Sequence, residues 1–141
     1  AETEATILES HRRVGNPVDD IIPVATGSEI IACRAAAAAV HVETAIRDYV
    51  VALSTATRND PRVAVGVSPR GSIALYKASQ ALAAIRGRDY AVPEDVKELL
   101  LPAFRKRLIL TGESRMKGYA AENILEELAL TVPAPPFRNK V

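Results

Sequence analysis

The stretch Gly66-Val67-Ser68-Pro69-Arg70-Gly71-Ser72 decides the fold, because it marks the start of an apolar helix. Ser68 is a residue type favoured at the helix N-cap, and Pro69 suits the first helical position, where no backbone N–H is needed. Arg70 then falls in the first turn, where the helix macrodipole opposes a cation by about 0.3–1 kcal/mol. Gly71 costs about 1 kcal/mol relative to alanine inside a helix. A cation beside free N–H groups weakens a helix start but suits anion binding; the alternative is that Arg70 simply points into water.

The composition is that of one small helical domain. The chain has 141 residues, of which 48% are hydrophobic but only 4% aromatic, so its core must be built from Ala, Leu, Val and Ile. A net charge of +1 gives no field that favours nucleic acid or a membrane surface. The single Cys33 excludes an internal disulfide and a cysteine metal cluster. We expect Cys33 to be a small buried apolar residue in a helix.

Membrane and secretion signals are not found in the sequence. No apolar run approaches the roughly 18 residues of a membrane span, and the acidic start Ala1-Glu2-Thr3-Glu4 is unlike a signal peptide. Together with the single cysteine, this predicts a cytoplasmic location and no membrane partner.

Apolar periodicity and capping residues predict an all-α fold, a bundle of about five helices. The expected helices cover residues 27–39, 43–58, 69–86, 93–107 and 121–131, after a short charged helix at 2–12. Thr26 and Glu29 have the spacing of a capping box at the start of the first of these. Residues 62–67 alternate in polarity and are expected to form at most a short extended segment, whereas residues 108–119 are expected to be irregular.

The apolar positions of each helix predict which face is buried. For the helices at 43–58 and 69–86 these faces are Ile46, Tyr49, Val50, Leu53 and Ala56, and Ile73, Ala74, Ala78, Ala81, Leu82 and Ile85. For the two later helices they are Val96, Leu99, Leu100, Ala103 and Phe104, and Ile124, Leu125 and Leu128.

A complete catalytic or metal-binding motif is missing from the sequence. There is no G-x-x-x-x-G-K-[ST] phosphate loop, since the stretch from Gly112 to Gly118 lacks the lysine. His11 and His41 have no Cys or His at ligand spacing, so no metal site is expected. The serines and Cys33 have no evident base partner, which argues against a nucleophilic hydrolase.

Clusters of like charge have structural explanations. The adjacent carboxylates of Asp19-Asp20, Glu94-Asp95 and Glu126-Glu127 point to different helix faces, so we expect solvated caps and surfaces rather than an acid–base pair. Arg105-Lys106-Arg107 lie where a helix C-terminus favours cations. Contact with nucleic acid is the alternative for this basic run.

Several segments in chain order carry a resemblance to a known family. They are Val42–Leu53, Ala56–Arg58, Gly66–Gly71, Ala81–Ala83, Arg86–Tyr90, Pro93–Lys97 and Arg107–Leu110. Together these segments resemble the C-terminal helical lid domain of the MoxR family of AAA+ ATPases, over roughly residues 5–133. The Ser-Pro-Arg helix start and the Gly-Arg-Asp-Tyr sequence at residues 87–90 are its most specific parts.

The resemblance assigns a role to the first stretch of sequence. In that family the arginine of the Ser-Pro-Arg motif is the second sensor of ATP, which makes Arg70 the catalytic residue and Ser68, Pro69, Arg70 and Gly71 the cofactor-binding ones. The chain departs from the family at Val92 and Ala120, which replace Thr or Ser caps; each loss should cost about 1 kcal/mol.

The resemblance also implies a division of the chain. Residues 1–14 resemble the end of the upstream AAA+ core domain, residues 15–26 are a linker, residues 27–132 form the helical lid and residues 133–141 are a flexible tail. The family's Walker motifs, first sensor and arginine finger belong to the core domain. The chain alone is therefore not expected to hydrolyse ATP or to bind it tightly, whereas the full-length parent is expected to be an ATPase that uses ATP with Mg²⁺.

The partners implied by the resemblance are the core domain and neighbouring subunits of a homo-oligomeric ring, a hexamer. The function implied is that of a chaperone for remodelling or cofactor insertion, with a von Willebrand factor A-domain protein as a further partner. Two alternatives come from other classes. One is a stand-alone helical module that binds DNA through Arg86, Arg88 and Arg105–Arg107, and the other is a helical enzyme in its own right, which the motif search disfavours.

Overall fold

A computed structural model describes residues 2–10, 12 and 17–136 of the chain. It divides into two compact units, Ala1–Ala32 and Cys33–Val141. His11 and parts of the predicted segments 1–14, 15–26 and 133–141 lie outside the described residues. The predicted domain boundaries stay predictions.

The first unit contains helix α1 (Glu2–Ser10), the 3-10 helix η1 (Pro17–Asp20) and the start of α2 (Gly27–Ala39). The predicted capping box at α2 is confirmed. The N–H of Thr26 donates to Glu29 Oε2 at 2.6 Å, and the N–H of Glu29 donates to Thr26 Oγ1 at 3.3 Å. The expectation that Cys33 is buried was wrong, because its side chain is exposed on a helix that has no buried residue.

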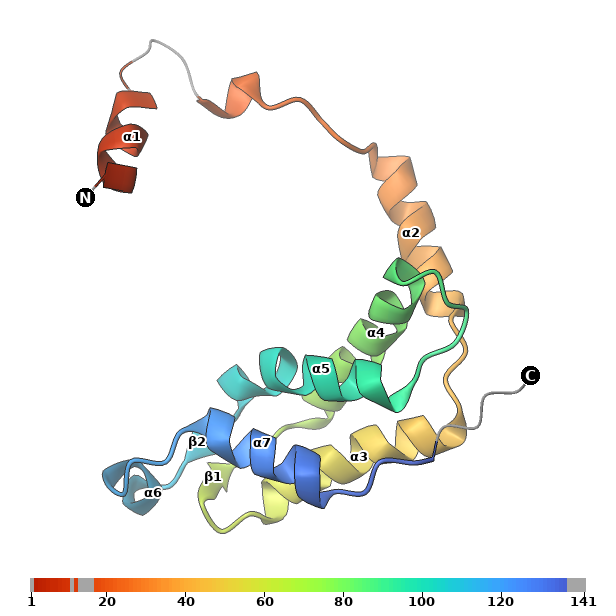
Figure 1. The fold of residues 1–141 in the computed structure, drawn as a ribbon, viewed down its shortest axis with the longest axis vertical. Helices are drawn as coiled ribbons and strands as arrows, with labels where there is room; N and C mark the ends of the chain where they lie inside the picture. The colour runs from red at the N-terminus through yellow and green to blue at the C-terminus, as the bar shows by residue number, and fades with distance from the viewer. Residues whose placement is uncertain (1, 11, 13–16, 137–141) are drawn as a thin grey trace. The chain divides into compact units, whose positions relative to one another are not determined.

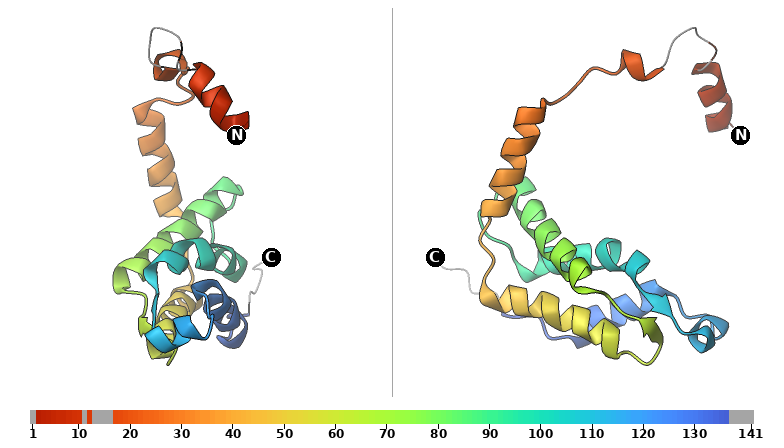
Figure 2. Two further views of the ribbon diagram at one scale, coloured as in Figure 1. Left: turned by 90° about the vertical axis from the view of Figure 1, so that its left-hand side faces the viewer. Right: turned by 180° about the vertical axis from the view of Figure 1, so that it is seen from behind.

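The second unit is the helical bundle. Its main helices are α3 (Thr44–Asn59), α4 (Pro69–Ile85), α5 (Pro93–Phe104) and α7 (Ala121–Thr131), and α5 continues into the 3-10 helix η2 (Arg105–Arg107). In Figures 1 and 2, α3 and α7 lie side by side, and α5 packs against both α4 and α7. The predicted helical fold is confirmed.

One hydrophobic core holds these helices together. Apolar side chains from α3, α4, α5, α7 and the segments between them meet in it, and burial of such side chains supplies about 25 cal/mol per Å² of apolar surface. Its buried residues are Ile46, Tyr49, Val50, Leu53, Val63, Val67, Leu75, Val96, Leu100, Phe104, Leu108, Leu110, Ile124 and Leu125.

A two-stranded antiparallel sheet, β1 (Val63–Val65) with β2 (Ile109–Leu110), joins the segment before α4 to the segment after η2. The predicted extended segment at 62–67 is confirmed. The prediction of irregular structure at 108–119 was wrong, because this stretch supplies β2 and then α6 (Gly112–Met116). Thr111 caps α6, accepting the N–H of Ser114 at 3.1 Å.

The predicted buried faces are confirmed for three helices. On α3, Ile46, Tyr49, Val50 and Leu53 are buried and Ala56 is half-buried. On α5 and α7, Val96, Leu100, Phe104, Ile124 and Leu125 are buried, and Leu99, Ala103 and Leu128 are half-buried.

The predicted buried face of α4 is confirmed only in part, because Ala74, Ala78, Ala81 and Leu82 are half-buried while the two isoleucines are exposed. Ile73 and Ile85 are 56% and 82% exposed, and the buried residues are Gly71, Leu75, Ser79, Gln80 and Ala83. The buried polar groups on this face are satisfied inside the protein, since Ser79 Oγ donates to Leu75 O at 2.9 Å and Gln80 Nε2 donates to Val40 O at 2.9 Å. Of the predicted face, only Ile73 and Ile85 are therefore exposed to solvent within the described residues.

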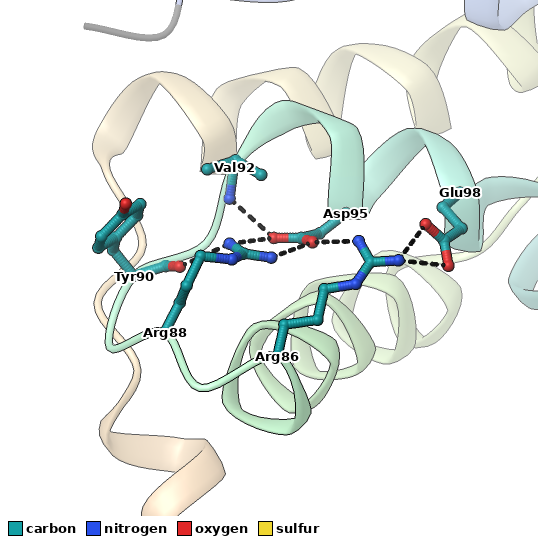
Figure 3. Close-up of polar contacts among 6 residues, drawn as sticks. All are labelled: Arg86, Arg88, Tyr90, Val92, Asp95 and Glu98. Carbon is teal, nitrogen blue, oxygen red and sulfur yellow. Dashed lines mark hydrogen bonds and ion pairs between the residues drawn. The ribbon is translucent and has the colours of Figure 1, made fainter. Parts of the chain in front are cut away.

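A buried carboxylate joins the end of α4 to the start of α5 (Figure 3). Asp95 accepts hydrogen bonds from Arg88 Nη2 at 2.6 Å and from Arg86 Nη1 at 3.2 Å. It also accepts the N–H of Val92 at 2.9 Å, which supplies half of a capping box where Val92 itself has no acceptor. The expectation of solvated carboxylates at Glu94-Asp95 holds for Glu94 and was wrong for Asp95, which is fully buried.

The surroundings of Asp95 keep it ionised. Burial opposes ionisation, but the hydrogen bonds from Arg88 and Val92 and the charges of Arg88 and Arg86 outweigh it, so the pKa of Asp95 is lowered. The side chain is thus a charged link between two helices.

Candidate functional site

The backbone at the start of α4 has the predicted order of an N-cap residue followed by a proline. Ser68 occupies the N-cap in an extended conformation and Pro69 the first helical position. The carbonyl of Ser68 accepts the N–H groups of Gly71 at 2.8 Å and of Ser72 at 3.3 Å. The Ser68 hydroxyl makes no capping hydrogen bond and is exposed, so the expected side-chain cap is not formed.

The residue before the N-cap is fixed to α3. Val67 is fully buried; its N–H donates to Thr57 Oγ1 at 3.0 Å, and its carbonyl accepts a bond from Arg58 Nη1 at 2.7 Å. Both backbone groups of Val67 are therefore held by the last turns of α3. This anchoring sets the position of the next residues, including Arg70.

A second pair of hydrogen bonds continues the link to α3. Ser72 Oγ donates to Ser54 Oγ at 2.8 Å, and Ser54 Oγ donates to Val50 O at 2.9 Å. Ser54 and Thr57 were not singled out from the sequence. The available signal was two hydroxyl residues three apart beside the predicted apolar face of the helix at 43–58.

Both glycines of the stretch are required by close packing. A Cβ on Gly66 would lie 2.6 Å from Arg58 Cα, and one on Gly71 would overlap Val67 Cγ1 and lie 3.2 Å from Arg107 Cδ. The cost of Gly71 in a helix is thus explained by the side chains that cross it. No room is left there for any other residue.

Arg70 extends from this anchored turn. Its side chain is exposed, and within the described part of the chain it has no hydrogen bond or ion pair. Many other basic residues do pair with carboxylates: Arg12, Arg47, Arg62, Arg86, Arg88, Arg105 and Lys117. The charge of Arg70 is available to an external anion.

A groove between α4 and α5 lies beside this turn. It has a volume of about 590 Å³ and is lined by five apolar residues of α4 and α5 and by two basic residues of η2. It is lined by Ala74, Ala78, Leu99, Pro102, Ala103, Lys106 and Arg107.

The sequence that forms this fold matches the family model of a known domain. Residues 55–128 match the profile of the family described as the AAA lid domain. The chain belongs to the AAA lid domain family.

The lid domain is similar to parts of longer proteins. It is 36% identical over 126 residues to YeaC of Bacillus subtilis (strain 168), covering 89% of this chain and 39% of YeaC. It is 38% identical over 103 residues to the chaperone MoxR1 of Mycobacterium tuberculosis, covering 67% and 27%. It is 31% identical over 109 residues to the protein MoxR of Paracoccus denitrificans, covering 67% and 32%.

The lid domain also matches a solved structure. A predicted ATPase from Cytophaga hutchinsonii superposes with a TM-score of 0.77 at 24% identity, over 94% of this chain and 43% of that one. This likeness supports the fold. The chain spans 39%, 27% and 32% of the lengths of the three relatives given above.

The alternative function, DNA binding, depends on arginines that are largely paired with carboxylates in the structure. Arg86 bonds Glu98 Oε2 at 2.7 Å as well as Asp95, and Arg88 bonds Asp95. Arg105 lies 3.7 Å from Glu122. These carboxylates offset the positive charge that a phosphate backbone would need.

The described residues offer neither a metal site nor a membrane-spanning helix. Within residues 2–10, 12 and 17–136, no cluster of three or more His, Cys, Asp or Glu is placed to hold a metal. No helix in the same part of the chain has the length and apolarity of a membrane span. His41 is exposed and lies 3.5 Å from Glu43.

Proposed function

We propose that this domain is the lid of a MoxR-type AAA+ ATPase in which Arg70 is the sensor-2 arginine. The observation that carries the proposal is the unpaired, exposed guanidinium of Arg70 on a turn anchored to α3. Neighbouring residues leave no room for a Cβ at Gly66 or Gly71, so the backbone of that turn is closely packed.

The residues at this turn suit a phosphate group. A guanidinium is always charged, and its planar fork can donate to two phosphate oxygens at once. Bound ATP with Mg²⁺, held by a core domain, supplies the phosphoryl group that is transferred to water. Arg70 would neutralise charge that develops on that group, and its attraction to the phosphate would couple nucleotide occupancy to the lid's position.

The assembly and role proposed follow from the family. We propose that the full-length protein forms a homo-oligomeric ring, a hexamer, in the cytoplasm and acts there as a chaperone for remodelling or cofactor insertion. A relative named chaperone MoxR1 supports this role. A von Willebrand factor A-domain protein is the proposed further partner. ATP and Mg²⁺ are proposed to be held mainly by the core domain, with Arg70 of the lid contacting the phosphate.

The experiment compares full-length wild type with Arg70→Ala and Arg70→Lys for ATP turnover and ATP affinity. A large fall in turnover with binding retained in Arg70→Lys is expected, because lysine keeps the charge but loses the fork. Arg115→Ala is the matched control, since Arg115 is an exposed arginine on α6. Unchanged turnover in both Arg70 variants would contradict the sensor-2 role.

A further inference from the structure

A second arginine crosses the first turn of α4. Arg107, from η2, packs its Cδ against Gly71, where an added Cβ would lie 3.2 Å from that atom. Its Nε donates to Ala103 O at 3.0 Å, which fixes the direction of the guanidinium. Among the described residues, no carboxylate pairs with the remaining donors of the guanidinium, and the side chain is exposed.

Arg70 and Arg107 are placed to act on one ligand. Arg70 immediately precedes Gly71, so the Cα atoms of these residues are about 3.8 Å apart. Ala74 is one turn after Arg70 on the same face of α4 and lines the groove together with Arg107. Arg107 thus crosses the helix at Gly71, the residue next to Arg70, and Arg70 shares a helix face with Ala74 at the groove.

The charge of this pair is uncompensated. Two neighbouring guanidinium groups repel each other, and no described carboxylate is paired with either of them. An anion with several oxygens, bound between the two, removes the repulsion and accepts bonds from both forks. A phosphate chain has that chemistry, whereas a single carboxylate offers only two oxygens.

We propose that Arg107 is a second phosphate-binding residue, which shares the phosphate chain of ATP with Arg70. This proposal rests on the proposed function of Arg70. In it, Gly71 serves to bring the two guanidinium groups together, because any side chain at this position would displace Arg107 from the turn.

The test uses the full-length protein with Arg107→Met and Arg107→Lys. Methionine keeps the packing over Gly71 but removes the charge, and lysine keeps the charge but not the fork. We expect Arg107→Met to weaken ATP binding about tenfold and Arg107→Lys to weaken it less, as loss of a charge-assisted bond predicts. Affinity for adenosine, which lacks phosphates, and the melting temperature should stay at their wild-type values. Arg115→Met is the matched control.

The outcomes separate the two proposals. Wild-type ATP affinity in Arg107→Met, alongside a turnover defect in the Arg70 variants, would overturn the role of Arg107 and leave that of Arg70 standing. Wild-type behaviour of both sets would overturn the sensor-2 proposal itself. A loss of adenosine affinity or of melting temperature equal to the loss of ATP affinity would show that Arg107 acts only on the structure, which also overturns its role as a phosphate ligand.

Discussion

Thr57 accepts the backbone N–H of Val67 at 3.0 Å and, through the same hydroxyl, donates to the carbonyl of Ser54 at 2.7 Å. One buried hydroxyl therefore joins the last turns of α3 to the segment that leads into α4. Because both partners are backbone groups, the bond fixes chain position rather than the orientation of one side chain.

Thr57→Val tests this link. Valine has the same shape but no acceptor, so the buried N–H of Val67 loses its partner, at a cost of about 1–3 kcal/mol in the free energy of unfolding. Urea unfolding followed by circular dichroism measures the change. Thr131→Val is the matched control, since the exposed hydroxyl of Thr131 bonds only within α7; an equal loss in both variants would contradict the prediction.

Gly71→Ala is expected to destabilise the domain despite the better helix propensity of alanine. A gain of about 1 kcal/mol from propensity is opposed by overlap with Val67 and Arg107, and overpacking of this kind costs about 1–3 kcal/mol. Gly112→Ala provides the comparison, because nothing lies within 4 Å of a Cβ there. A melting temperature for Gly71→Ala at or above wild type would show that the turn is not tightly packed.

Breaking the Asp95 cluster is expected to be costly. Asp95→Asn keeps the shape but leaves Arg86 and Arg88 without their shared carboxylate, and loss of one partner of a buried pair costs about 3 kcal/mol or more. The lower end applies here because the side chain of Arg86 is 41% exposed. Glu98→Gln removes only the exposed bond of Arg86 and should cost under about 1 kcal/mol, so similar unfolding midpoints for the two variants would refute the prediction.

Acid should destabilise the domain in a predictable window. The hydrogen bonds from Arg62 lower the pKa of Asp60 against the effect of burial, and the pKa of Asp95 is lowered as well. Carboxyls with depressed folded-state pKa values contribute stability above the unfolded-state value of about 3.9, and this stability is lost as pH falls through the folded values. Urea midpoints measured from pH 6 down to pH 3 should fall, and should fall less in Asp95→Asn. Parallel curves would exclude Asp95 as a source.

Leu75 and Ile73 of α4 are expected to contribute differently to the free energy of unfolding. Leu75 is fully buried, so Leu75→Ala should cost about 2–5 kcal/mol. Ile73 is 56% exposed, so Ile73→Ala should change stability by about 0.5 kcal/mol or less. The same urea measurement checks both, and a larger loss for Ile73→Ala would mean that its face is covered.

The sequence predicts helices well where one apolar face is dominant. The spacing of Ile46, Val50 and Leu53 places them on one side of α3, and this side is buried in the structure. On α4 the buried side includes the polar residues Ser79 and Gln80, and the hydrogen-bond partner of Gln80, Val40, is 40 residues away in the sequence. Strand β2 was missed for the same reason, since its partner β1 is distant in sequence.

The candidate site also has features that the sequence predicts and features that it does not. The position of Arg70 in the first turn of α4 follows from Ser68 and Pro69, which are local signals. The contacts of Ser54, Thr57 and Arg107 depend on which helices pack together. No local sequence pattern predicts that packing. Cys33 was misjudged because an alanine-rich helix suggests close packing, whereas α2 has no buried residue. Contact of Arg70 with a phosphate stays a prediction.

Helix α4 is fastened at both ends: hydrogen bonds to α3 hold the turn before its start, and Arg86, just past its last residue, is bonded to Asp95 of α5. A helix of 17 residues spans about 25 Å at 1.5 Å per residue. The helix cannot slide along its axis without breaking hydrogen bonds at one end or the other. A force applied at Arg70 would therefore be transmitted to both α3 and α5, the two helices to which the ends of α4 are bonded.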